Sequence, residues 1–251
     1  AGLYYYANET LFFHVSQTDA PDFQTYLYAC PWDIAEDSDP DMTKCKVFPL
    51  KNPREFPYSY GQIEDAVYIG TNNGAVIKFQ NGSWTTLREA NASVSFQIYT
   101  MINYHDRLLM GQYPTGELFE IANDKLVHLA GWPPRPINVS GTAREAQTMT
   151  IYRGDLFVGL WPWGEVWRLN DRTKTWDFVG RLFTHPEPTS EITAPFEDEM
   201  TQLGEKVNNL WGQRVTSLIP FQDMLIASTS NKGGTPYRQE YTFLDNNIHE
   251  E

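Results

Sequence analysis

Short apolar strands and glycine turns recur along the chain in the same order. Three stretches, 65–79, 107–121 and 155–169, each open with an apolar run that ends in glycine, then turn at a second glycine. Each continues as a segment in which apolar and polar residues alternate, which is typical of a β-strand with one buried face. We therefore predict a β-hairpin in each stretch.

Two further strand-like segments flank every predicted hairpin. The strands before them are expected at 58–62, 99–104 and 147–152, and those after them at 83–87, 125–129 and 175–179. The first glycines, Gly70, Gly111 and Gly159, mark a period of about 40 to 50 residues. A period of this length with four strands is typical of the blades of a β-propeller.

Two weaker copies complete the pattern. One covers 215–227 and continues through Gly233-Gly234 to a strand at 237–243, and the other, without the glycine in its middle turn, has strands at 3–7, 10–15, 25–29 and 46–50. We predict an all-β chain, a single β-propeller domain over 1–251 with five blades of four antiparallel strands. The blades are expected at about 1–52, 55–90, 96–134, 144–183 and 211–251, with an insertion at 184–210. The last copy shows three strands, so an incomplete blade and a piece of a larger propeller are alternatives.

The aligned blocks, such as Val67–Thr71 followed by Gly74–Phe79, resemble the general propeller-repeat pattern. In that pattern a Leu/Val-Tyr-x-Gly-Thr strand meets a Gly-x-Val-Tyr-x-Phe/Tyr strand, and the blocks are similar to the repeats of two-component-regulator propellers. The resemblance implies an architecture and assigns no catalytic residue. No WD dipeptide recurs at an equivalent place in the copies, and the Ser-x-Asp-x-Gly-x-Thr-Trp box of sialidases does not occur in the sequence.

Net charge, hydropathy and the two cysteines limit the classes of partner and predict one covalent link. The formal net charge of −13 makes nucleic acid an unlikely partner, because phosphates would be repelled. No run of 18 apolar residues occurs, so no membrane insertion is predicted. Cys30 and Cys45 flank an acidic loop at one end of a hairpin and are expected to form a disulfide.

Four Asn-x-Ser/Thr sequons begin at Asn8, Asn81, Asn91 and Asn138. With the disulfide they predict a secreted, extracellular glycoprotein. Two buried free thiols in a cytosolic protein are the alternative. The acidic loop 33–41 could offer carboxylates to calcium, but it lacks the glycine and the terminal glutamate of an EF-hand, so no cofactor and no metal site are predicted.

The candidate ligand site is the face formed by the turns between strands 2 and 3 and by the links between blades. The aromatic residues expected there are Tyr113, Trp132, Trp161 and Trp163, and the polar residues at the starts of the first strands are Gln97, Arg144, Glu145, Gln147 and Arg214. Packing between blades is the alternative for the rings, and a wet polar channel is the alternative for the polar residues. Ser59, Thr100, Thr148 and Thr216 are expected at equivalent places, where their hydroxyls would bond neighbouring blades.

Rings of this kind stack on the C–H faces of sugars, and the polar groups bind hydroxyls. We therefore predict a lectin-like protein whose partner is a glycan or polysaccharide. An enzyme acting on polysaccharides at the same face is one alternative: a hydrolase would need a second carboxylate beside Glu145, and a lyase would use Tyr113 with Arg144 or Arg214. A scaffold that binds another protein is the other alternative. No phosphate loop, nucleophile elbow or metal-spaced histidine cluster is present in the sequence.

Overall fold

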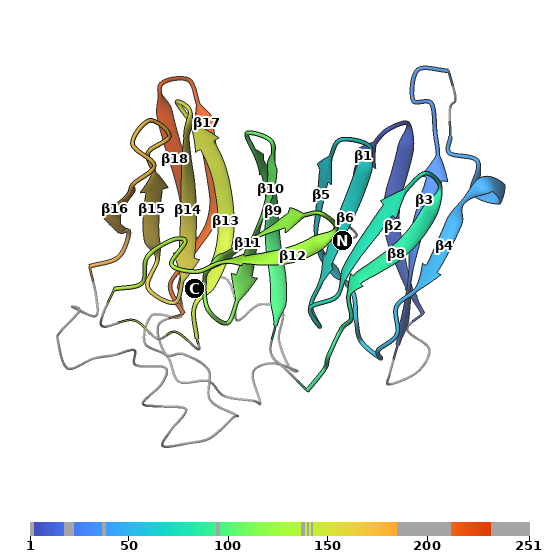
Figure 1. Cartoon of the computed structure of the whole chain (residues 1–251), viewed down its shortest axis with the longest axis horizontal. Coiled ribbons are helices and arrows are strands. Elements are labelled where there is room, and N and C mark those ends of the chain that lie inside the picture. The colour runs from blue at the N-terminus through green and yellow to red at the C-terminus, as the bar shows by residue number, and fades with distance from the viewer. Residues whose placement is uncertain are drawn as a thin grey trace.

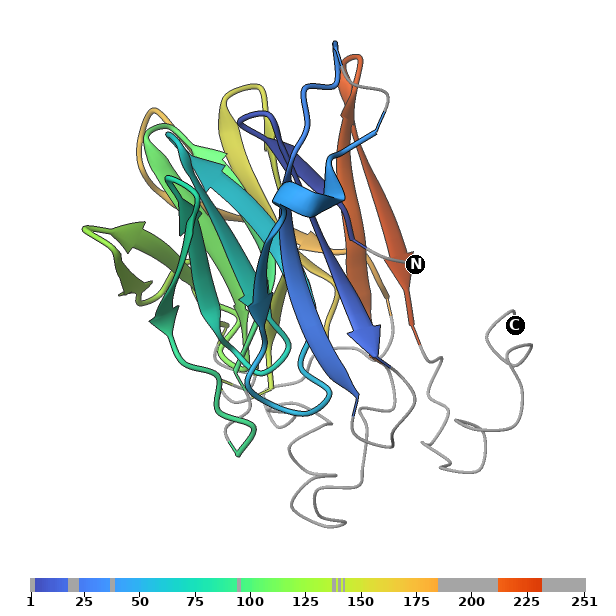
Figure 2. The ribbon, with the colours of Figure 1, turned by 90° about the vertical axis from the view of Figure 1, so that its right-hand side faces the viewer.

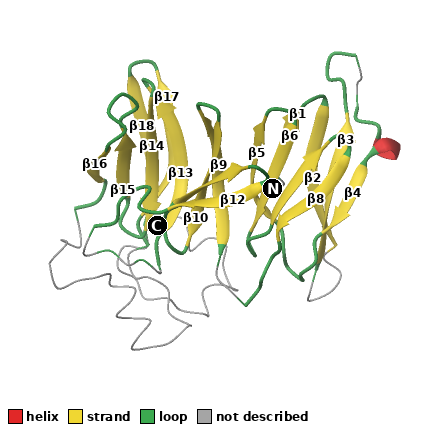
Figure 3. Ribbon diagram, in the orientation of Figure 1, coloured by secondary structure: helices red, strands yellow, loops and turns green. Residues whose placement is uncertain are grey.

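The computed structural model describes residues 3–17, 23–36, 39–93, 96–136, 139, 141, 143–184 and 212–231. The regular structure there consists of strands and of one 3-10 turn, η1 (Met42–Lys44), as Figure 3 shows. The all-β prediction is thus confirmed for this part of the chain. The predicted strand at 237–243, almost all of the insertion and the sequon at Asn138 lie outside the described residues.

Four sheets of four antiparallel strands follow one another along the chain, and every strand pairs with its neighbours in sequence. The first sheet contains β1 (Tyr5–Ala7), β2 (Thr10–Gln17), β3 (Gln24–Pro31) and β4 (Lys46–Pro49). The second contains β5 (Pro57–Ile63), β6 (Ala66–Thr71), β7 (Val76–Gln80) and β8 (Ser83–Arg88). The third contains β9 (Gln97–Tyr104), β10 (Arg107–Tyr113), β11 (Leu118–Ala122) and β12 (Lys125–Leu129). The fourth contains β13 (Glu145–Tyr152), β14 (Asp155–Trp161), β15 (Glu165–Leu169) and β16 (Trp176–Arg181).

A fifth, two-stranded sheet follows, made of β17 (Arg214–Phe221) and β18 (Met224–Ser230). Figure 1 shows the first sheet at the right and β13–β18 at the left, and Figure 2 looks along the row of sheets from the side of the first. The prediction of four-stranded antiparallel units is confirmed for four sheets, and the prediction of a closed five-bladed ring is not.

The core consists of four apolar layers, each between two consecutive sheets. Phe12 and Leu27 of the first sheet pack with Ile69 of the second, and Tyr68 of the second packs with Ile98 of the third. Leu109 lies in the cluster of the third and fourth sheets, and Phe157 in that of the fourth and fifth. Among the described residues no buried cluster joins the fifth sheet to the first.

A glycine in the second strand of three sheets sets how closely the next sheet approaches. A Cβ added at Gly70 would lie 2.6 Å from Cβ of Ile98, and one at Gly159 would lie 2.7 Å from Cβ of Val215. One at Gly111 would clash with the carbonyl oxygen of Ala146. These are the glycines whose spacing revealed the repeat, and their lack of a side chain is what lets the first strand of the next sheet lie against them.

Hydroxyl side chains stand opposite these glycines. Ser59 pairs with Gly70, and its hydroxyl donates to the carbonyl oxygen of Ile98 in the next sheet at 2.9 Å, the predicted bond between neighbouring units. In the fifth sheet the equivalent residue is Ser217, which pairs with Ser228, and not Thr216 as predicted. A register shift between Val215 and Ser217 leaves Thr216 unpaired, so the alignment by sequence was displaced by one residue.

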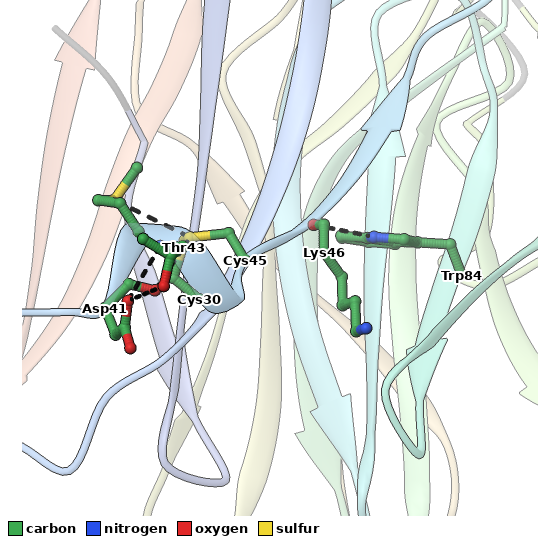
Figure 4. The surroundings of a disulfide bond; sticks show 7 residues. Cys30, Asp41, Thr43, Cys45, Lys46 and Trp84 are labelled. Carbon is green, nitrogen blue, oxygen red and sulfur yellow. Dashed lines mark hydrogen bonds between the residues drawn. A yellow bond between two sulfur atoms is a disulfide. The ribbon is translucent and has the colours of Figure 1, made fainter.

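The predicted disulfide between Cys30 and Cys45 is present (Figure 4). Cys30 lies on β3 and Cys45 directly follows η1. Asp41 caps η1, because its carboxylate accepts from the backbone N–H of Thr43 at 3.0 Å. The disulfide therefore ties the end of the acidic loop to β3.

Replacing Gly111 by Ala tests the close approach of the sheets. We expect a loss of about 1–3 kcal/mol in the free energy of unfolding, because the added methyl group overpacks the contact with Ala146. Urea unfolding of the two proteins measures this loss of free energy. Val127→Ala, at an exposed position of the same sheet, is the control and should change stability by less than about 0.5 kcal/mol. Equal effects of the two substitutions would contradict the role given to the glycine.

Removing the disulfide in a Cys30→Ala, Cys45→Ala variant should lower stability by about 3 kcal/mol. The two residues are 15 apart in sequence, and a cross-link of that span restricts the unfolded chain by about this amount. Unfolding of the native protein with and without a reducing agent measures the same quantity independently. An unchanged unfolding midpoint in both experiments would show that the loop is held by other contacts.

Candidate functional site

The first strands of the sheets lie side by side, so that β5 contacts β9, β9 contacts β13 and β13 contacts β17. We call these four the inner strands. Each sheet's turn between its second and third strands also reaches the link before the next sheet. The backbone N–H of Arg144 donates to the carbonyl oxygen of Pro114 at 2.8 Å, and that of Gln213 donates to the carbonyl oxygen of Pro162 at 3.0 Å. The turns and links expected on one face are thus joined after the third and the fourth sheets, and the N–H of Asn91 makes the same bond to the carbonyl oxygen of Asn73 after the second.

Each inner strand carries a register shift at the same position. The residues left without a direct partner are Tyr58, Tyr99, Gln147 and Thr216, one in each of four sheets. A bulge re-aims the side chain of the extra residue and often lies next to a functional site. The repetition of the bulge therefore presents one side chain from each sheet at an equivalent place.

Five side chains gather at this end of the inner strands: Tyr58, Tyr99, Tyr113, Glu145 and Arg214, which we call the inner-strand cluster. The rings of Tyr58 and Tyr99 have centroids 4.9 Å apart. The carboxyl of Glu145 and the guanidinium of Arg214 lie close enough for their charges to act on the Tyr99 hydroxyl. The cluster therefore unites a carboxyl, a guanidinium and three phenols from four consecutive sheets.

Burial governs the titration of this cluster. Removal from water raises the pKa of Glu145 to about 7, although the positive charge of Arg214 acts in the opposite direction. Burial also raises the pKa of the Tyr58 and Tyr99 hydroxyls, which stay protonated donors at neutral pH. Near neutrality the Glu145 carboxyl therefore exchanges between a donor and an acceptor state.

Three buried polar atoms on β13 and β17 have no hydrogen-bond partner among the described residues. They are Oε1 of Glu145, Oε1 of Gln147 and Nε of Arg214. Buried polar atoms are nearly always bonded, so these atoms would bind water or a polar ligand. Two are oxygens and one is an N–H, which matches a ligand that both donates and accepts.

One of the predicted rings, Tyr113, belongs to this cluster, and a second, Trp161, lies beside it. Tyr113 faces Gln97 across its sheet and Trp161 faces Glu145 across the next. Their ring centroids are 6.2 Å apart, as expected for neighbouring turns. Tyr113 is half-buried, whereas Trp161 is only 8% exposed, so Trp161 is also a part of the packing between sheets.

The other predicted site residues lie elsewhere. Arg144 is fully buried, and its guanidinium binds Glu165 at 2.8 Å and the carbonyl oxygen of Pro134 at 3.0 Å. Trp163 lies under the guanidinium of Arg181, 4.8 Å from the ring centroid. Trp132 packs edge-on against Trp176 with centroids 5.7 Å apart. The structure therefore brings together Gln97, Tyr113, Glu145, Gln147, Trp161 and Arg214 and places Arg144, Trp132 and Trp163 in other contacts.

Sequence reasoning missed Tyr58 and Tyr99. The signal available was their shared place at the start of the strand before the hairpin in two consecutive copies. In a regular strand, successive side chains point to opposite faces of the sheet. The rings turn toward Glu145 because of the bulge, which only the structure shows.

No group of three or more His, Cys, Asp or Glu side chains positioned to hold a metal ion occurs in the part of the chain that the structure describes. Residues 37 and 38 of the acidic loop fall outside that part. Within the same part, no helix is long and apolar enough to cross a membrane.

No family model matches the sequence, and no curated protein matches it. Several solved structures match the structure of the chain. The extracellular domain of a hybrid two-component system from B. thetaiotaomicron is 12% identical with a TM-score of 0.48, covering 86% of this chain and 24% of that one. The extracellular domain of a one-component system from the same organism is 12% identical with a TM-score of 0.44, covering 88% and 30%. The computationally designed protein Ika8 is 9% identical with a TM-score of 0.41, covering 93% and 68%. The chain spans less than a third of the length of the first two.

The raised pKa of Glu145 predicts how stability depends on pH. The folded state keeps the proton up to about pH 7, while the unfolded chain loses it near 4.5. The folded state therefore binds more protons between these values, and stability should fall as pH rises through this window, by about 3 kcal/mol in all. Urea unfolding at about pH 5 and about pH 8 measures the fall, which Glu145→Gln should remove. The same fall in the variant would assign it to another group.

Proposed function

We propose that this protein binds glycans at the inner-strand cluster. The observation that carries the proposal is the set of three unpartnered polar atoms, on Glu145, Gln147 and Arg214, beside aromatic rings. Sugar hydroxyls donate and accept at once, so one sugar unit bonds to both kinds of atom. A binding site of this kind combines apolar walls with a few polar groups that fix the orientation of the ligand.

Tyr113 and Trp161 supply the apolar wall. Their rings come from consecutive sheets, and the residue after each is a proline, whose ring restricts the backbone of the residue before it. A ring held in this way loses little conformational entropy when a ligand stacks on it. Gln97, opposite Tyr113, adds an amide at the edge of the same wall.

We propose further that the chain forms a five-bladed β-propeller and is extracellular. The inner strands of consecutive sheets lie side by side, as blades around an axis require, and the fifth sheet already supplies two strands. The disulfide favours an oxidising compartment. Asn81 and Asn91 are exposed at turns, where a sequon is accessible to glycosylation.

Catalysis on a polysaccharide is the second candidate, favoured by one observation. Burial brings the pKa of Glu145 near neutrality, as an acid–base group requires. A hydrolase would need a second carboxylate, and the described residues of the cluster supply only Glu145. A lyase would use a tyrosine with Arg214 beside the acidic group of the substrate. Release of reducing ends or of unsaturated sugars from any bound glycan distinguishes these activities from binding alone.

Replacing Tyr113 by Ala tests the proposal. A glycan-array screen identifies a ligand, and isothermal titration calorimetry then compares the variants. Tyr113→Ala should weaken binding by about 1–3 kcal/mol, the usual loss for an aromatic anchor. The unfolding midpoint should change little, because the ring is half-buried at a turn.

Two further variants complete the experiment. Tyr4→Ala removes a ring that is 70% exposed in the first sheet and should leave affinity unchanged. Trp161→Ala should lower stability by about 3–5 kcal/mol in addition to its effect on binding, because its ring is buried. Full affinity in the Tyr113 variant, or no glycan bound in the screen, would refute the proposed function.

A further inference from the structure

A cavity of about 610 Å³ lies beside the outer strands of the fourth sheet. The residues that matter in its lining are Arg135, Trp163, Glu165, Trp167, Phe178 and Arg181. Glu165 and Trp167 belong to β15, while Phe178 and Arg181 belong to β16. No residue of the inner-strand cluster lines it, so the cavity is separate from the site described above.

Aromatic rings form one wall of the cavity. Trp167 and Phe178 face each other across β15 and β16, with ring centroids 5.0 Å apart. Phe178 is half exposed, which is unusual for a ring of its size in a strand. The indole N–H of Trp167 donates to Oε2 of Glu165 at 2.8 Å and fixes the orientation of this wall.

Among the described residues, two guanidiniums and one carboxylate line the cavity, although the chain carries a net charge of −13. The guanidiniums belong to Arg135 and Arg181, and the carboxylate, Glu165, pairs with the buried Arg144 at 2.8 Å. Arg135 donates to the carbonyl oxygen of Val139 at 2.6 Å, and Arg181 donates to the side chain of Gln213 at 2.8 Å. An anionic group therefore lowers the electrostatic energy of this site.

Two buried polar atoms of the lining have no partner among the described residues: Nε1 of Trp163 and Oε1 of Glu165. Both residues are at least nine-tenths buried, Trp163 at 4% and Glu165 at 1% exposed. One atom is a donor and the other an acceptor. A buried polar atom without a hydrogen bond raises the free energy of the folded protein. A ligand that supplies both an acceptor and a donor is therefore favoured.

We propose that this cavity binds an acidic sugar unit, a hydroxylated ring that carries a carboxylate. The C–H face of the ring lies on Trp167 and Phe178, and the carboxylate binds the guanidinium of Arg135. Ring hydroxyls donate to Glu165 and accept from Trp163. An aryl or alkyl carboxylate lacks the donor that Glu165 requires, and a neutral sugar lacks the charge. The inference adds a second site to the proposed glycan binding and does not depend on the first.

The experiment measures binding of D-glucuronate to the full chain by saturation-transfer NMR and calorimetry, with D-glucose and benzoate as comparison probes. We expect glucuronate to bind at least about tenfold more tightly than either, because each comparison probe loses one charged or buried hydrogen bond. Arg135→Gln should weaken glucuronate binding by a similar factor. Phe178→Ala should also weaken it, and both residues are exposed enough to replace without unfolding the sheet.

Matched controls separate this site from the inner-strand cluster. Arg153→Gln and Val179→Ala, at exposed positions outside the cavity, should leave glucuronate binding unchanged, and so should Tyr113→Ala. Loss of glucuronate binding in the Tyr113 variant would place the acidic sugar at the inner strands and overturn the inference. Equal affinity for glucose or benzoate, no binding of glucuronate, or full binding by Arg135→Gln would overturn it as well, whatever the outcome for the proposed glycan site.

Discussion

The close approach of consecutive sheets at three glycines is the constraint on which the rest of the structure depends. At Gly70, Gly111 and Gly159 a methyl group would meet Ile98, Ala146 and Val215 of the next sheet. The absence of a side chain lets apolar layers pack at the density of a protein interior. Each layer joins only two consecutive sheets, so stability is distributed along the array as a sum of similar interfaces.

The close approach of consecutive sheets also forms the candidate site. Because β9, β13 and β17 each lie against the second strand of the preceding sheet, the starts of the inner strands converge. The repeated bulge then turns Tyr58, Tyr99 and Gln147 to the same place. Convergence excludes water from Glu145 and raises the pKa of its carboxyl, which an isolated hairpin would leave solvated. The close packing of the sheets is therefore also what raises the pKa of Glu145.

The strands, their order and the disulfide could be predicted from the sequence, because alternation and glycine spacing are local signals. The pairing of Tyr113 with Trp161 followed from the repeat, since equivalent turns of consecutive units are neighbours. Side-chain direction outside the regular register could not be predicted. Arg144 precedes Glu145 by one residue, yet its partner Glu165 is 21 residues away, and no local pattern specifies that pair. The offset between Thr216 and Ser217 has the same origin, because a bulge changes the face of every residue on one side of it.

The two ends of the array explain why closure matters to the proposed architecture. Ile219, Phe221 and Ile226 of the fifth sheet are each about half exposed, and so are Leu3 and Val15 near the other end. An array held together by layers between neighbours leaves one apolar face without a neighbour at each end, and soluble repeat proteins cover such faces. A ring covers both faces with one interface, whereas any open arrangement needs a separate cover for each. The apolar side chains at both ends are therefore faces that a neighbouring sheet would cover, and the proposed ring would cover both with one interface.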